Sequence, residues 1–167
     1  MKKLIAVAVV AMMILGTSVS ANEWNKIRIG VEGAYPPFSW VEKDGTLKGF
    51  DIDIAMALCE EIGAECVLVP QDWDGIIPAL LARKYDAIIA SMSITEERKK
   101  KVAFSGKYYN TPAKFARKKG SGITISKAGM KGKKVGVQRA TTHDNFITAE
   151  FGDSVEIKRY GTQDEAY

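Results

Sequence analysis

The sequence predicts an α/β protein with a parallel sheet. Short segments rich in β-branched residues alternate with segments whose apolar residues recur at helical spacing, in the order strand, helix, strand, helix, strand. The same alternation restarts toward the C-terminus. The composition agrees with a globular domain that can build a core, since 46% of the 167 residues are hydrophobic and 26% are charged.

The first 21 residues have the pattern of a secretory signal peptide. Two lysines precede an unbroken apolar run from Leu4 to Leu15, and small residues follow as far as Ala21. As a helix this run is about 18 Å long, too short for a hydrocarbon core of about 30 Å. We therefore expect cleavage after Ala21 and export, with a retained membrane anchor as the alternative.

The elements of the first half follow from hydrophobic periodicity and from residues that end helices and strands. Apolar side chains recur at helical spacing up to a glycine in the first helix, and the last strand is continuously apolar, as in the middle of a parallel sheet. The predicted elements are strand 26–31, helix 49–63, strand 65–70, helix 72–85 and strand 86–91. Ligands in such sheets bind beyond the carboxyl ends of the strands.

In the second half, three segments interrupt the alternation of strands and helices before it restarts. A short charged helix begins at Thr95, residues 107–119 predict a long strand that could cross out of the first lobe, and residues 119–134 are loop-like and basic. Strand 133–137, a helix capped by Thr141 or Thr142, strand 154–160 and the first turn of another helix follow. Two strands cannot complete a second lobe, so we expect either a fragment of a longer reading frame or a natural truncation.

Cys59 and Cys66 are the only cysteines, and they lie seven positions apart after the export signal. In an oxidising compartment an even pair at this spacing most simply forms one disulfide. A metal site would need more ligands than two thiols and the single histidine, His143, and a redox pair would need closer spacing. We therefore predict a structural disulfide, and neither metal nor cofactor.

Net charge and missing motifs exclude several function classes. The formal charge of +4 falls to +2 without Lys2 and Lys3, which is too weak a bias to indicate nucleic-acid binding. The sequence has no HExxH, GxSxG, P-loop, GxGxxG or EF-hand motif. Glu32 is the only strand-end carboxylate that could act as a general acid, and no second catalytic group accompanies it, so we predict that the chain is not an enzyme.

Polar and aromatic side chains do gather at the predicted strand ends. A guanidinium with two hydroxyls suits a carboxylate, a carboxylate suits an ammonium group, and aromatic rings stack on a flat or cationic side chain. Together these groups favour a site for a zwitterion, although each one singly could be a core aromatic, a helix cap or an ion-pair partner. The candidates are Glu32, Tyr35, Trp73, Ser91, Ser93 and Arg98.

Three motifs of this sequence resemble those of a known protein family. The segments GVEGAYPPFSW at 30–40, GFDIDIA at 49–55 and SMSITEER at 91–98 closely resemble the family 3 extracellular solute-binding proteins, the periplasmic receptors of amino-acid ABC transporters. The cysteine pair resembles the disulfide of the lysine/arginine/ornithine and histidine receptors. The resemblance implies a two-lobe (type II) periplasmic binding protein fold, with a signal peptide at 1–21, a first lobe at 22–111 lacking its return segment, and a partial second lobe at 112–167.

The resemblance also implies roles for individual residues. Arg98 would pair with the α-carboxylate of the ligand, helped by Ser91 and Ser93, while Ala90 stands where many relatives have serine. Tyr35 and Trp73 would stack on the ligand side chain, and Glu32 would receive the far end of a basic side chain. In the second lobe the implied contacts are Gln138, Thr141 and Thr142.

The function implied is delivery of an L-amino acid, most simply arginine, lysine, ornithine or histidine, to an inner-membrane ABC permease. We expect a monomer without a nucleic-acid partner. The acidic residue that holds the α-amino group in relatives would lie beyond Tyr167. The alternatives are a periplasmic cyclohexadienyl or arogenate dehydratase-like enzyme, a sensor module and a non-functional truncated remnant.

Overall fold

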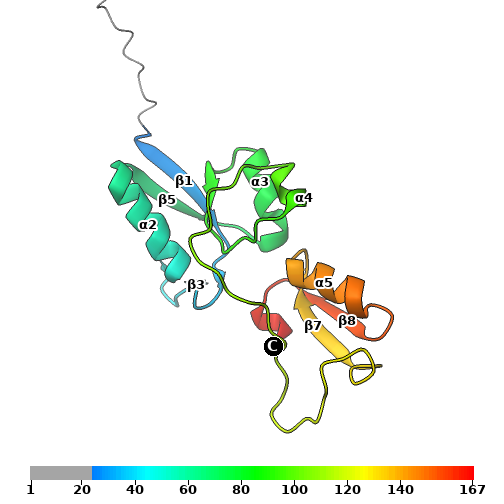
Figure 1. The fold of residues 1–167 in the computed structure, drawn as a ribbon. Coiled ribbons are helices and arrows are strands. Elements are labelled where there is room, and N and C mark those ends of the chain that lie inside the picture. The colour runs from blue at the N-terminus through cyan, green and yellow to red at the C-terminus, as the bar shows by residue number, and fades with distance from the viewer. Residues whose placement is uncertain (1–23) are drawn as a thin grey trace, which may run out of the picture.

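A computed structural model describes residues 24–167, so the predicted signal peptide lies outside the described residues. The first half is built on a three-stranded parallel sheet in the order β5-β1-β6 (Figure 1). Its strands are β1 (Lys26–Val31), β5 (Glu65–Pro70) and β6 (Ala87–Ile88). Ile29 lies between Leu68 of β5 and Ala87 of β6. The predicted parallel sheet is confirmed, with a last strand shorter than expected.

Helix α2 (Phe50–Ile62) covers one face of this sheet and α3 (Ile76–Leu81) the other (Figure 1). The predicted helix 72–85 is divided, because a 3-10 turn, η1 (Trp73–Gly75), precedes α3. It also ends early, since Arg83 adopts a left-handed conformation and the Lys84 N–H bonds back to the Ala79 carbonyl.

The two faces of β1 explain how the core is divided. Ile29 and Val31 point toward α2 and pack with Ile52. Gly30, between them, points the other way, where a Cβ atom would lie within 2.5 Å of the Tyr85 ring. The missing side chain therefore lets Tyr85 reach the sheet, where it is 1% exposed beside α3.

The residues between β1 and α2, for which the sequence predicts only a turn, form a second, antiparallel sheet. Its strands are β2 (Ala34–Tyr35), β3 (Ser39–Val41) and β4 (Leu47–Lys48). Gly49 then enters α2 with a φ of 125°, and a Cβ atom there would overlap the Phe38 carbonyl. Glycine at this position lets the chain turn into the helix.

The predicted disulfide between Cys59 and Cys66 is present and ties the end of α2 to β5, with a Cα–Cα distance of 5.9 Å. Replacing both cysteines with alanine is expected to lower the free energy of unfolding by about 2 kcal/mol, because the unfolded chain regains the freedom of a short closed loop. Urea unfolding of the two proteins would measure this difference. The double variant without reductant and the wild type with its disulfide reduced should have the same free energy of unfolding. An unchanged free energy of unfolding in the double variant would contradict the prediction.

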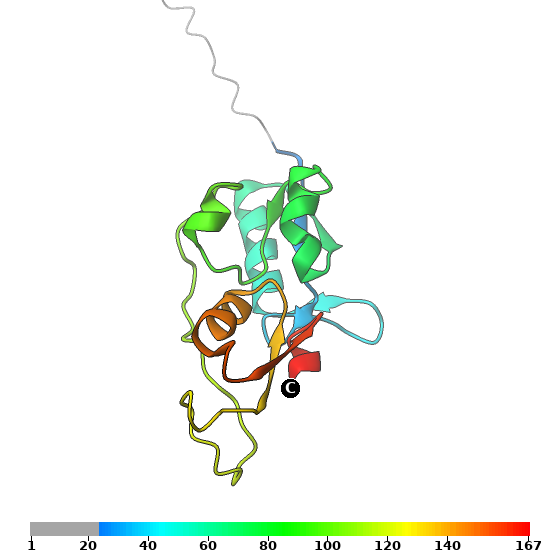
Figure 2. The same ribbon diagram turned by 90° about the vertical axis from the view of Figure 1, so that its right-hand side faces the viewer.

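The second half contains a parallel pair, β7 (Lys134–Gln138) and β8 (Glu156–Tyr160), packed against α5 (Thr142–Phe151). The Thr141 hydroxyl accepts a hydrogen bond from the Asp144 N–H, so Thr141 is the cap of α5. Figure 2 shows this unit beside the first sheet. The short α4 (Glu96–Lys99) begins after Thr95 as predicted, and the last turn is η2 (Asp164–Ala166).

The prediction of a strand at residues 107–119 is wrong. This segment contains neither helix nor strand, and no strand within residues 24–167 pairs with it. Alternation of polar and apolar side chains makes a strand only where a neighbour supplies hydrogen-bond partners. The division into lobes at residue 112 stays a prediction. Within residues 24–167 no helix is long and apolar enough to span a membrane.

Candidate functional site

A small cavity of about 50 Å³ lies where the carboxyl ends of the first sheet face the start of α5. All nine residues predicted to bind ligand line it: Glu32, Tyr35, Trp73, Ser91, Ser93, Arg98, Gln138, Thr141 and Thr142. Ala90, His143 and Gln163 complete the lining. Whether these residues bind a ligand stays a prediction, but the fold brings the whole set together.

Arg98 is the basic residue of this cavity. It lies in α4, where the Thr95 hydroxyl accepts its backbone N–H. Its guanidinium donates to the Ser93 carbonyl at 2.9 Å, and the guanidinium carbon lies 5.3 Å from the centroid of the Trp73 ring. Burial lowers the pKa of Arg98, yet a guanidinium remains charged at neutral pH. A cation held in this way can pair with a carboxylate through two parallel hydrogen bonds.

Glu32 is the only carboxylate among the residues that line the cavity within the described part of the chain. It directly follows β1, is 9% exposed and accepts a hydrogen bond from the Gln138 amide at 2.5 Å. Burial is the main reason why the pKa of Glu32 is raised, and this hydrogen bond opposes it. An amide neutralises no charge, so a cation entering the cavity would find an acceptor with no basic partner.

Hydrogen bonds join the two halves of the chain around the cavity. The Trp73 indole N–H donates to the Ala140 carbonyl at 3.0 Å, and Arg98 reaches the same oxygen at 3.4 Å. Arg139 forms an ion pair with Asp74 nearby. Every one of these contacts links the first sheet and its loops to the loop before α5. The walls of the cavity therefore come from both halves.

The two predicted aromatic residues are differently placed. Tyr35 stacks on Phe38, with ring centroids 5.1 Å apart, and burial raises the pKa of its hydroxyl. Trp73 has the Arg98 guanidinium against its ring instead. Each ring thus already has one neighbour against it, and a ligand side chain would occupy the space that remains between them.

Ser91 makes contacts that bear on its predicted role. Its hydroxyl donates to the Asp51 carboxylate at 2.7 Å, and its backbone has a φ of 51°, in the left-handed region. A hydroxyl has one proton, so toward the cavity the Ser91 oxygen can only accept a hydrogen bond. Its hydroxyl therefore suits an ammonium group better than the carboxylate for which the resemblance proposed it.

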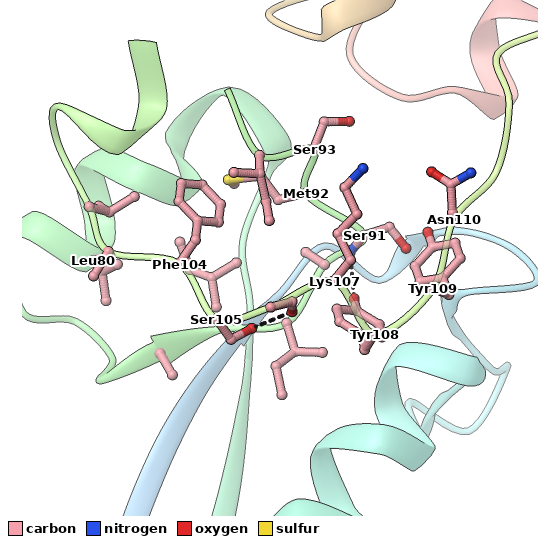
Figure 3. A pocket seen from close by; sticks show the side chains of 18 of the residues that line it. Leu80, Ser91, Met92, Ser93, Phe104, Ser105, Lys107, Tyr108, Tyr109 and Asn110 are labelled. Atoms are coloured by element: carbon pink, nitrogen blue, oxygen red, sulfur yellow. Dashed lines mark hydrogen bonds between the residues drawn. The ribbon is translucent and has the colours of Figure 1, made fainter. Parts of the chain in front are cut away.

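A network behind the cavity holds Ser91 in place. The Tyr108 hydroxyl donates to the second oxygen of Asp51 at 2.8 Å and accepts the Ser91 N–H at 3.2 Å. Asp51 is 1% exposed, and burial raises its pKa against the effect of these hydrogen bonds. Figure 3 shows Ser91 and Tyr108 facing each other in a larger cavity of about 630 Å³ beside β6.

Residues 27–164 match the model of the bacterial extracellular solute-binding proteins, family 3. The chain belongs to this family. It is 50% identical to an L-arginine-binding protein of Pseudomonas aeruginosa over 99% of its own length and 64% of the relative. It is 39% identical to a histidine-binding periplasmic protein of Salmonella typhimurium over its whole length and 65% of that protein. The chain thus spans just under two thirds of these relatives.

The solved structures agree with this assignment. An ancestral arginine-binding protein bound to arginine superposes with a TM-score of 0.76 at 40% identity, over 85% of this chain and 63% of the other. The predicted periplasmic binding protein fold is therefore confirmed, as a partial one. The relatives are binding proteins by name, in agreement with the prediction that this family 3 chain is not an enzyme.

Sequence reasoning missed Asp51 and Tyr108 in this family 3 chain. Asp51 lies in the first turn of α2, where an acidic residue is ordinary because it complements the helix dipole. Asp53 in the same turn is exposed, and only the packing distinguishes the two. The one available signal was that Asp51 directly precedes Ile52, a core residue on the same helix.

Proposed function

We propose that the complete protein is a periplasmic receptor that binds an L-amino acid with a cationic side chain, arginine first, and delivers it to an ABC permease. The observation that carries this proposal is a single cavity lined by a buried carboxylate, Glu32, and a half-buried guanidinium, Arg98. A ligand with a carboxylate at one end and a cation at the other matches both groups. The names of the relatives support the same class of ligand.

Each part of the ligand has a chemically matched partner in this proposal. Arg98 and the N-terminal end of α5 attract the α-carboxylate. The Ser91 hydroxyl oxygen accepts from the α-ammonium group, and Glu32 accepts from the side-chain cation. Tyr35 and Trp73 stack on the side chain between these ends.

Closure of the two halves would accompany binding. Across the cavity, the Gln138 amide donates a hydrogen bond to Glu32, and the Trp73 indole donates one to the Ala140 carbonyl. A ligand can replace these bonds with its own donors and acceptors, and it then contacts both halves at once. Only the closed arrangement satisfies every polar group of such a ligand, so binding favours closure.

The Glu32→Gln variant is expected to bind arginine and lysine at least about tenfold more weakly, while the affinity for glutamine changes little. The substitution keeps the size and one acceptor but removes the charge that a cationic side chain requires. Isothermal titration of the complete protein with the three amino acids measures the difference. Equal losses for all three ligands would contradict a basic ligand.

The affinity for arginine is also expected to fall as the pH drops through the pKa of Glu32. Because burial raises that pKa, the carboxylate gains a proton at a higher pH than an exposed glutamate does, and the attraction for the guanidinium is then lost. Titrations at pH values from about 4 to about 7 measure this dependence. The Glu32→Gln variant is the control that separates Glu32 from Asp51, whose pKa is also raised. An identical pH dependence in both proteins would exclude Glu32 as its source.

A further inference from the structure

The charges of this chain are divided very unevenly along its length. From Lys99 to His143 there are thirteen basic residues and no acidic one, so all 20 acidic residues lie elsewhere. Eight of the thirteen fall in residues 114–134, called the basic segment below: Lys114, Arg117, Lys118, Lys119, Lys127, Lys131, Lys133 and Lys134. The small net charge of the whole chain conceals this concentration.

The basic segment lies at one end of the molecule. In both views residues 112–132 loop out at the end far from the start of β1 (Figures 1 and 2). All eight basic residues are exposed, and none forms an ion pair within residues 24–167. In contrast, Lys99 and Arg139, which lie outside the segment, pair with Glu96 and Asp74. These eight charges are therefore open to an external anion.

We propose that the basic segment binds the anionic headgroups of a phospholipid membrane. Seven of its eight cations are lysines, whereas protein interfaces are enriched in arginine and depleted in lysine. Single-stranded nucleic acid would need several aromatic rings for stacking, and Phe115 is the only aromatic residue of the segment. A fluid layer of phosphates needs only mobile point charges on flexible stems, which lysine supplies.

Two further properties of the segment fit a lipid surface. Its apolar residues Phe115 and Ile125 are 39% and 41% exposed, and such side chains can enter the headgroup region beside the lysines. After Ala21, the chain outside residues 99–143 has nine basic and 20 acidic residues. An anionic surface would repel that remainder, so the protein would approach it with the basic segment first.

Vesicle binding tests this proposal independently of amino-acid binding. The complete mature protein is mixed with vesicles of phosphatidylglycerol and phosphatidylethanolamine, or of phosphatidylcholine alone, and the bound fraction is measured by flotation. Each lysine near an anionic surface contributes about fivefold to the binding constant. A variant with Lys118, Lys119, Lys131 and Lys133 changed to glutamine is therefore expected to bind the anionic vesicles at least about 100-fold more weakly. Added salt should weaken the wild type.

The matched control changes the same number of lysines, all exposed, outside the basic segment: Lys26, Lys43, Lys48 and Lys84. This control loses the same net charge and should retain most of the vesicle binding. An equal loss in both variants, or no preference of the wild type for anionic over neutral vesicles, would overturn the proposal. Binding to a poly-glutamate peptide without binding to vesicles would also overturn it and would indicate an acidic protein partner. Arginine titration should be the same in all three proteins, because none of these lysines lines the amino-acid cavity. Thermal unfolding should change little, because all eight lysines are exposed and the control removes only two exposed ion pairs, Lys26–Glu65 and Lys48–Glu42.

Discussion

The Arg98→Ala variant of the complete protein is expected to lose affinity for every amino acid by at least about 100-fold. In the proposed complex the guanidinium neutralises the α-carboxylate, which all amino acids share. Removing one partner of a buried ion pair costs about 3–5 kcal/mol because the other charge stays buried and unpaired. Isothermal titration with arginine, lysine and glutamine measures this loss.

Two further variants make the result specific. Lys99→Ala removes an exposed cation from the same short helix, where it pairs only with Glu96, and should leave affinity unchanged. Arg98→Lys keeps the charge but not the planar pair of donors, so it should restore only part of the affinity. Normal binding by the alanine variant would show that Arg98 is not the carboxylate partner. Stability should change little, since the guanidinium bonds only backbone carbonyls, Ser93 and Ala140.

The Asp51→Ala variant is expected to lower the free energy of unfolding by about 3 kcal/mol and to weaken amino-acid binding as well. It leaves the part-buried hydroxyls of Ser91 and Tyr108 without their shared acceptor, and a hydrogen bond to a charged group contributes about 1.5–3 kcal/mol. Ser91 also loses the contact that directs its proton away from the cavity. Denaturant unfolding measures the first effect and ligand titration the second.

Asp53→Ala is the matched control for Asp51. Both carboxylates lie in the first turn of α2, but Asp53 is exposed. If Asp51 acts only through the helix dipole, the two variants should lose the same small amount, about 0.3–1 kcal/mol. Asp51→Asn retains one of the two acceptor oxygens, so its free energy of unfolding should lie between those of Asp51→Ala and the wild type. Equal effects of the two alanine variants would contradict a positioning role for Asp51.

Periodicity was sufficient for the first sheet because its strands are apolar and are joined by helices, which is the arrangement that parallel pairing requires. Apolar positions of β1 and α2 meet on one face of the sheet, and glycine with cysteine marks the turn between α2 and β5. Residues 107–119 show where this reasoning ends. Their alternation resembles that of a strand, but pairing depends on a partner that no local pattern specifies.

The sequence by itself determined the α/β class, the disulfide and the set of residues around the candidate site. These follow from local periodicity, from residue chemistry at strand ends and from the family motifs. Only the tertiary structure decided which contacts each of these groups makes. It buried Asp51 and left Asp53 exposed, and it directed the Ser91 hydroxyl proton to Asp51. The direction of a hydroxyl proton and the burial of a carboxylate depend on contacts between residues far apart in sequence, such as Asp51 and Tyr108, and sequence spacing does not encode such contacts.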